Sequence, residues 1–147
     1  MTKNVLTIAL LVLGFSACAP SSSVSQSKPT QVIVLQAVGV LSTGVTSKVG
    51  GIARFKELSN GSTIVEVEIT NLPPEKRSAG YIRVGSCSNP GGIAATLTEM
   101  TSDKAGVGIS STTVDTSKIP VSAYISFHQR GEKDTGGIGG SVTCGNL

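Results

Sequence analysis

The sequence predicts an all-β domain, a Greek-key sandwich or flattened barrel of about seven or eight antiparallel strands. Three observations support this prediction. Residues 63–70 alternate between apolar and polar side chains, which is typical of a strand with one buried face. The Asn60-Gly61 pair before this segment favours a hairpin with a type I′ turn, because both residues tolerate positive φ. The chain also has 18 glycines and no tryptophan, so we expect tight turns and an aliphatic core.

The expected strands are short and are separated by residues that favour turns. The third ends at Leu72-Pro73-Pro74, because proline has no N–H to donate to a sheet. Loops are expected at residues 88–92 and at residues 129–140, which are rich in charge and glycine. In chain order, the strands are expected at residues 31–41, 49–58, 63–70, 81–85, 93–100, 107–114, 120–128 and 141–144.

Two of the later strands are expected to have one buried and one outward face. In the first, alternation separates Ile82 and Val84 from Tyr81 and Arg83. In the second, it separates Ala123, Ile125 and Phe127 from the side chains that we expect to face outward, which are Tyr124, Ser126 and His128.

The N-terminus has the pattern of an export signal. The apolar run over residues 5–15 is long enough for a signal-peptide core and too short to span a bilayer. The next residues, Phe15-Ser16-Ala17-Cys18, resemble a bacterial lipobox, although Phe15 stands where leucine is usual. This resemblance implies that Cys18 is acylated and becomes the mature N-terminus. The alternative is ordinary signal-peptidase cleavage at Ala17-Cys18-Ala19, with an incidental cysteine.

These features divide the chain into a signal peptide (1–17), an acylated cysteine with a Ser/Pro-rich tether (18–30) and a β-sandwich domain (31–147). We expect an exported, membrane-anchored bacterial lipoprotein on the periplasmic or cell-surface side. Its expected partners are the membrane, through the lipid anchor, and another envelope protein or a small ligand. The net charge of +3 is not concentrated in any stretch, so nucleic acid is not an expected partner.

Cys87 and Cys144 are expected to form a disulfide. If Cys18 carries lipid, they are the remaining pair among the 3 cysteines, and export places them where a disulfide persists. The alternative is a redox-active or metal-binding pair, which is disfavoured because neither cysteine has a CxxC partner.

Five short stretches are relevant to the family of the domain: the succession from Gly50 to Phe55, the strand ending at Leu72, AGYIRVG at 79–85, YISFH at 124–128 and CGNL at 144–147. Together these motifs resemble the copper/zinc superoxide dismutase fold, and the related CHRD domain is similar too. The resemblance covers most of residues 32–147 and implies a β-sandwich of this type. In that family, a loop cysteine bridges to a cysteine in a terminal Cys-Gly-hydrophobic stretch, which implies the same Cys87–Cys144 pairing.

The same resemblance implies that the metal centre of the family is missing. The His-x-His copper motif falls on Tyr81 and Arg83, and a guanidinium does not lose its proton to bind a metal. His128 matches a further copper ligand, but it is the single histidine of the chain. Asp103 falls near the zinc aspartate, and Ser141 takes the place of the arginine that guides superoxide. We therefore expect no cofactor and no dismutase activity, with weak copper or zinc binding at His128 as the alternative.

The candidate surface-binding patch consists of Tyr81, Arg83, Tyr124 and His128. The alternative is that they cover the sheet, with Arg83 paired to a nearby carboxylate and His128 at the surface or an interface. No nucleophile with its base and no phosphate-binding glycine loop is recognisable in the sequence. The expected function is a non-catalytic binding or structural module. The alternative is a degenerate copper/zinc-handling or superoxide dismutase-type protein that uses His128.

Overall fold

The protein is described here by a computed structural model. The structure describes residues 30–37, 48–130 and 138–147. Four sequence-based expectations lie wholly or mostly outside these residues: the signal peptide 1–17, the acylated Cys18 with its tether, the end of the first strand and the loop at 129–140. Within the described ranges, no helix is long and apolar enough to cross a membrane.

The described residues form strands and a single 3₁₀ turn, so the all-β prediction is confirmed. In chain order the elements are β1 (Gln31–Ala37), β2 (Gly50–Glu57), β3 (Ser62–Thr70), β4 (Arg77–Gly85), β5 (Pro90–Thr96), β6 (Met100–Thr101), β7 (Gly108–Asp115), η1 (Thr116–Lys118), β8 (Ala123–Arg130) and β9 (Ile138–Asn146).

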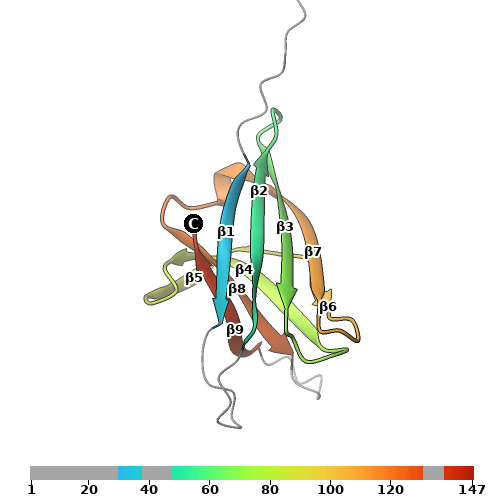
Figure 1. Cartoon of the computed structure of the whole chain (residues 1–147). Coiled ribbons are helices and arrows are strands. Elements are labelled where there is room, and N and C mark those ends of the chain that lie inside the picture. Colours follow the sequence, from blue (N-terminus) through green and yellow to red (C-terminus); the bar gives the residue numbers. More distant parts are fainter. Residues whose placement is uncertain (1–29, 38–47, 131–137) are drawn as a thin grey trace, which may run out of the picture.

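All strand pairs are antiparallel and form one curled sheet in the order β5-β4-β8-β9-β1-β2-β3-β7, with β6 beside β4. We call β1, β2, β3 and β7 the front sheet, and β4, β5, β6, β8 and β9 the back sheet. Figure 1 looks onto the front sheet, with the back sheet behind it. The chain crosses from β3 to β4 and from β7 to β8, so β3 pairs with β7 and β4 pairs with β8. This is a Greek-key arrangement.

The two sheets are joined differently along their two edges. On one edge, β1 pairs with β2 over residues 31–35 and with β9 over residues 36–37, so the backbone ladder passes from front to back. On the other edge, side chains link Thr98 to β7. The Thr98 N–H donates to Thr112 Oγ1 over 2.7 Å, and the Ser110 hydroxyl donates to the Thr98 carbonyl over 2.7 Å. The sheet therefore curls into a flattened barrel.

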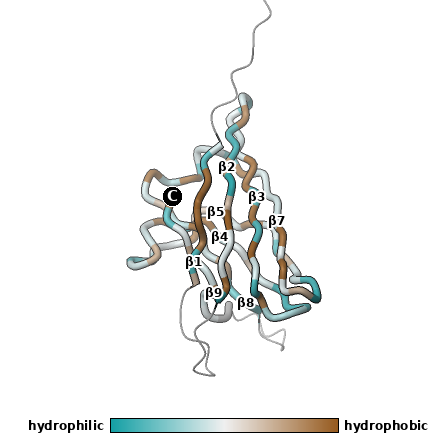
Figure 2. The backbone as a smooth tube through the Cα atoms, viewed as in Figure 1, coloured by the Kyte–Doolittle hydropathy of each residue, from teal (hydrophilic) through white to brown (hydrophobic). Residues whose placement is uncertain are grey.

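The core lies between the two sheets and is mainly aliphatic. The alternation predicted for 63–70 is confirmed, because Glu66 and Glu68 are exposed while the side chains between and beside them are buried. Figure 2 shows this alternation along the front strands. Gly80 lets β4 pass close to the core aromatic Phe127, since an added Cβ would lie 2.4 Å from the Phe127 ring. Core residues include Leu35, Ala53, Phe55, Val65, Val67, Ile69, Ile82, Ile125 and Phe127.

The predicted hairpin between β2 and β3 is confirmed, but its turn is not type I′. That turn requires positive φ at both central residues, whereas Gly61 has φ +82° and Asn60 is not among the residues with positive φ. The Gly61 N–H donates to the Leu58 carbonyl over 3.2 Å, and the Leu58 N–H donates to the Ser62 carbonyl over 2.8 Å. The loop is thus a longer turn in which only the last position needs glycine.

Several expected strand boundaries are wrong, and those of β5 and β8 differ at both ends. β5 begins at Pro90, inside the expected loop at 88–92, and it ends at Thr96. Proline is tolerated there because β5 is an edge strand. β8 begins at Ala123 rather than at Pro120, and it continues to Arg130 into the expected loop. The lengths of β5 and β8 are thus set by their pairing within the back sheet. A local sequence pattern carries no information on that pairing.

Candidate functional site

The four residues of the predicted patch do come together, on the outer face of the back sheet. β4 and β8 are neighbours, and in their register Arg83 lies opposite Tyr124, while Tyr81 lies opposite Ser126. His128 is two residues further along β8 on the same face. The core-facing positions between them are filled by Ile82, Ile125 and Phe127.

Contacts between these side chains link the two strands. The rings of Tyr81 and His128 meet edge to face, with centroids 5.8 Å apart, a geometry that aromatic pairs favour. Ser126 Oγ lies 3.2 Å from His128 Nε2, within hydrogen-bond distance. The predicted patch did not include Ser126. Its place between Tyr124 and His128, two residues from each, was the signal that could have included it.

Tyr124, Ser126 and His128 lie on the outer face, as expected, but this face is not open to solvent. Tyr81 is 7% exposed, Tyr124 is 3% exposed and His128 is 9% exposed. By contrast, Val84, which shares the face of Ile82, is 47% exposed near the end of β4.

The loop after β4 is held against this same face. Cys87 and Cys144 form the disulfide that was predicted, with their Cα atoms 6.0 Å apart. The Cys87 N–H also donates to the side-chain oxygen of Asn146 over 2.8 Å. Cys144 lies opposite Ser126, and Asn146 lies opposite Tyr124. The disulfide therefore anchors the loop next to the patch.

Arg83 differs from the other arginines of the back sheet. Its Nε is buried and has no hydrogen-bond partner. Arg77 and Arg130, by contrast, both contact the Glu99 carboxylate, Arg130 through Nε at 2.9 Å. Partial burial alone raises the pKa of Glu99, but hydrogen bonds from the two arginines outweigh it and lower this pKa below its usual value. The expected pairing of Arg83 with a carboxylate is not found among the described residues.

Asp103 and Ser141, which the resemblance matched to a zinc ligand and to the anion-guiding arginine, make local hydrogen bonds in this structure. The Asp103 carboxylate accepts hydrogen bonds from the N–H groups of Ala105 and Val107, each over 2.8 Å, so it stabilises the turn before β7. Ser141 lies opposite His128, and its hydroxyl donates to the Thr143 carbonyl over 3.2 Å. Among the described residues, no group of three His, Cys, Asp or Glu side chains could hold a metal ion.

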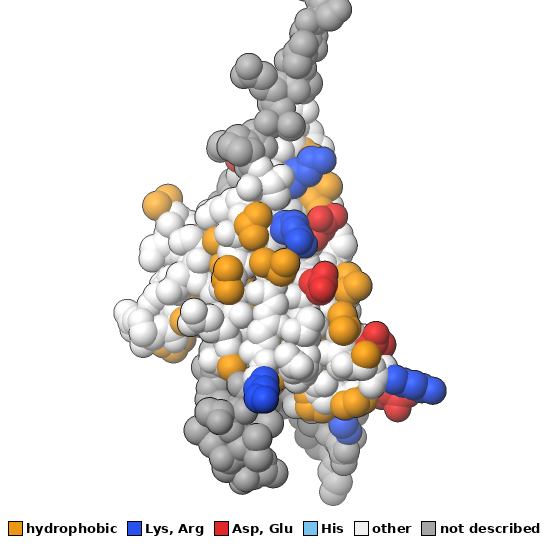
Figure 3. Space-filling model, in the orientation of Figure 1, with side chains coloured by type: hydrophobic (Ala, Val, Ile, Leu, Met, Phe, Trp, Pro, Cys, Tyr) orange, Lys and Arg blue, Asp and Glu red, His pale blue; other side chains and the backbone are white. Residues whose placement is uncertain are grey.

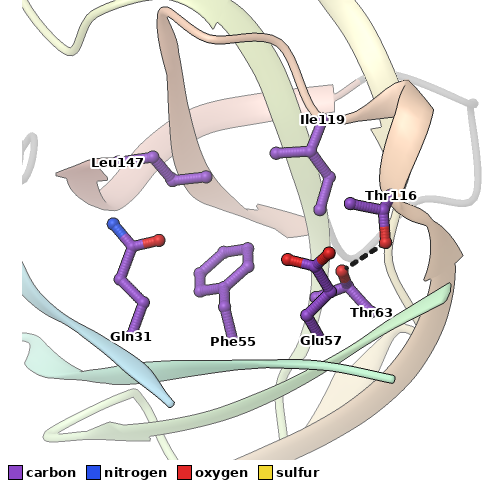
Figure 4. A pocket seen from close by; sticks show the side chains of 7 residues that line it. All are labelled: Gln31, Phe55, Glu57, Thr63, Thr116, Ile119 and Leu147. Atoms are coloured by element: carbon purple, nitrogen blue, oxygen red, sulfur yellow. Dashed lines mark hydrogen bonds between the residues drawn. The ribbon is translucent and has the colours of Figure 1, made fainter. Parts of the chain in front are cut away.

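Two hollows were not foreseen, because each is built from elements that are distant in sequence. One, of about 480 Å³, lies beside the disulfide and is lined by Val34, Gln36, Ala37, Cys87, Ser88, Cys144, Gly145 and Asn146. The other, of about 290 Å³, lies at one end of the barrel. In Figure 4 the ring of Phe55 points into it, and the Thr63 and Thr116 hydroxyls hydrogen-bond at its side over 2.8 Å. Its remaining lining residues are Gln31, Glu57, Ile119 and Leu147.

The end hollow is a weaker candidate site than the patch. Its Thr63 and Thr116 hydroxyls already bond each other, and it is open and slightly smaller than most ligand pockets. The patch instead combines aromatic, hydroxyl, imidazole and guanidinium groups that are largely buried on an outer face. Comparison of the sequence with protein-family models and with curated proteins finds no match.

Proposed function

We propose that this chain is an exported lipoprotein, anchored to a bacterial membrane through Cys18, whose β domain is a non-catalytic binding module. The proposed family is the copper/zinc superoxide dismutase-like sandwiches, without their metal centre. The N-terminal pattern supports the anchor, and the antiparallel Greek-key barrel is compatible with the family resemblance. The proposed binding surface is the patch of Tyr81, Arg83, Tyr124, Ser126 and His128 on the back sheet.

One observation carries the binding proposal. Polar and aromatic side chains gather on the outer face of the back sheet, and one of them, Arg83, has a buried Nε without a protein partner among the described residues. A buried donor without a partner costs stability, on the order of 1–3 kcal/mol. Such groups often serve a function rather than the fold.

The proposal is tested by capturing the full chain from membranes under mild detergent. The wild-type chain should fractionate with membranes, carry acyl mass at Cys18 and retain a partner or small ligand. Cys18→Ser should release it into the soluble fraction. Arg83→Gln should lose the bound component, while Arg54→Gln should keep it, because Arg54 is similarly buried but lies on the front sheet.

Two results would overturn parts of this proposal. A soluble wild-type chain without acyl mass would contradict the anchor. A component retained equally by Arg83→Gln would place binding elsewhere on the domain. Stoichiometric copper or zinc in the captured chain, lost on His128→Ala, would favour the alternative of a metal-handling protein.

A further inference from the structure

We infer that the patch on the back sheet binds an anionic oxygen group, a carboxylate or a phosphate-type oxyanion, through the guanidinium of Arg83. This inference rests on the proposed binding function and adds the chemical class of the ligand.

The charge of the strands around the patch favours an anionic ligand over a cationic one. Arg83 is the permanently charged residue of the patch, and none of the described residues of β4, β5, β8 or β9 is acidic. Glu99, in the link after β5, is already bonded to Arg77 and Arg130. A cationic ligand would therefore find no free carboxylate within these elements, whereas an anion would find an uncompensated positive charge.

The buried Nε of Arg83 also favours an anionic ligand. Arginine has five N–H donors and no acceptor, and its planar fork suits the paired oxygens of carboxylates and phosphates. The Nε of Arg83 is buried without a protein acceptor among the described residues. An oxygen of a bound anion can supply that acceptor, and the bond is strengthened by the charge on both partners.

The side chains beside Arg83 add hydrogen-bonding groups to its positive charge. Tyr124 lies directly opposite it, Tyr81 is two residues away on the same strand, and Ser126 lies opposite Tyr81. The two tyrosines carry hydroxyls that can donate to an anion, whereas the Ser126 hydroxyl already contacts His128 Nε2. The low exposure of Tyr81, Tyr124 and Ser126 also reduces competition from water, which strengthens hydrogen bonds to a charged group. The patch thus presents several donors together with a permanent cation.

Arg54 on the front sheet provides the matched comparison. Like Arg83 it is partly buried and points outward from a sheet. Its cross-strand neighbour, however, is Glu66, whose negative charge lies directly opposite. Cross-strand charges of opposite sign favour each other, and this negative charge repels an added anion. The two arginines therefore differ in the charge of their cross-strand neighbours.

The experiment titrates the full chain, purified in detergent, with sodium phosphate and separately with sodium acetate at constant ionic strength. Tetramethylammonium chloride serves as the cationic control. Binding is followed by the nuclear magnetic resonance signals of the arginine Nε–Hε groups and of the His128 ring. We expect saturable movement of the Arg83 signal with at least one anion and none with the cation. The two anion arms separate a carboxylate ligand from a phosphate ligand.

The variants decide whether Arg83 is responsible. Arg83→Gln should weaken anion binding at least tenfold, and Arg83→Lys should weaken it measurably, because lysine keeps the charge but lacks the fork. Arg54→Gln should bind as the wild type does. If Arg83→Gln fails to fold, Arg83→Lys and the wild-type Arg83 signal still test the inference. It is overturned if neither anion moves that signal saturably, or if both Arg83 variants bind as tightly as the wild type.

Failure of this inference is distinguishable from failure of the proposed function. If both anions fail while a captured component still depends on Arg83, the patch binds another chemistry and the binding module stands. If the captured component is also independent of Arg83, both proposals fail.

Discussion

The outer faces of the two sheets show how the same alternating pattern gives different surfaces. On the front sheet, Arg54 lies opposite Glu66, and Val34 is 66% exposed. Figure 3 shows this face, with hydrophobic side chains lying among both positive and negative ones. On the back sheet, Arg83 lies opposite Tyr124, which is 3% exposed. One outer face is thus a mixed, solvent-exposed surface, whereas the other behaves as a second buried layer.

The difference teaches that alternation reports which side chains share a face, but not whether that face is open. The front strands β2 and β3 follow the usual rule, with apolar residues inside and charged residues outside. Most of β8 is buried on both faces, although its pattern also alternates. The Cys87–Cys144 disulfide and the Tyr81–His128 ring pair both lie on this outer face.

The disulfide should produce the largest difference between the two faces. It closes a segment of 57 residues and fixes the loop after β4 beside the patch. Replacing Cys87 and Cys144 together by serine should lower the free energy of unfolding by about 4 kcal/mol in the chain-entropy account. Urea denaturation of the oxidised wild type and of the double variant measures this loss.

Hydrogen exchange locates the effect of removing the disulfide. Amides of β8 and β9 should lose more protection than those of β2 and β3 in the double variant. Reduction of the wild type should reproduce the change, which controls for the serine side chains. If the free energy of unfolding falls by less than about 1 kcal/mol, the disulfide contributes little to stability.

Truncating one outward side chain on each face should have a smaller but clearly unequal effect. Tyr124→Ala removes a buried aromatic ring and should cost about 3 kcal/mol. Val34→Ala removes two methyl groups from an exposed position and should change stability by less than about 0.5 kcal/mol. Urea denaturation compares the two variants, and Tyr124→Phe controls for the hydroxyl. Equal costs for the two alanine variants would show that the back face is as open as the front face.

The fold was largely predictable from sequence because its signals are local. The alternation in 63–70 fixes the faces of β3, and the glycine after Asn60 marks the hairpin. The Cys87–Cys144 pairing followed from counting cysteines after assigning Cys18 to lipid. These features depend on nearby residues or on composition, so they need no knowledge of how the sheets pack.

The site was predictable only in part because burial is a property of the whole fold. Sequence identified Tyr81, Arg83, Tyr124 and His128, and the register brings them together. It failed to predict their burial, because alternation within one segment assigns side chains to a face but does not say how exposed that face is. It also missed the hollow beside the disulfide, to which Gln36 of the first strand contributes.

The smallest expected effect concerns the ion pairs of Glu99 with Arg77 and Arg130 at one end of the back sheet. The pKa of Glu99 is lowered in the folded state, although partial burial opposes the shift. A lowered pKa means that the unfolded chain binds the proton more readily. The stabilisation is therefore present above the usual carboxylate value of 4.5 and is lost as the pH falls below it. Its size should be about 1 kcal/mol or less, because these groups remain partly exposed.

Glu99→Gln tests this sign directly through the pH dependence of unfolding. At pH 7 the variant should unfold at a lower urea concentration than the wild type, and near pH 3 the difference should shrink. Arg130→Gln should show a reduced form of the same behaviour, because it leaves the contact from Arg77 in place. A difference that stays constant between the two pH values would mean that Glu99 contributes through packing and neutral hydrogen bonds. In that case the back sheet would contain no stabilising ion pair at this end, and its contrast with the front sheet would rest on the buried patch and the disulfide alone.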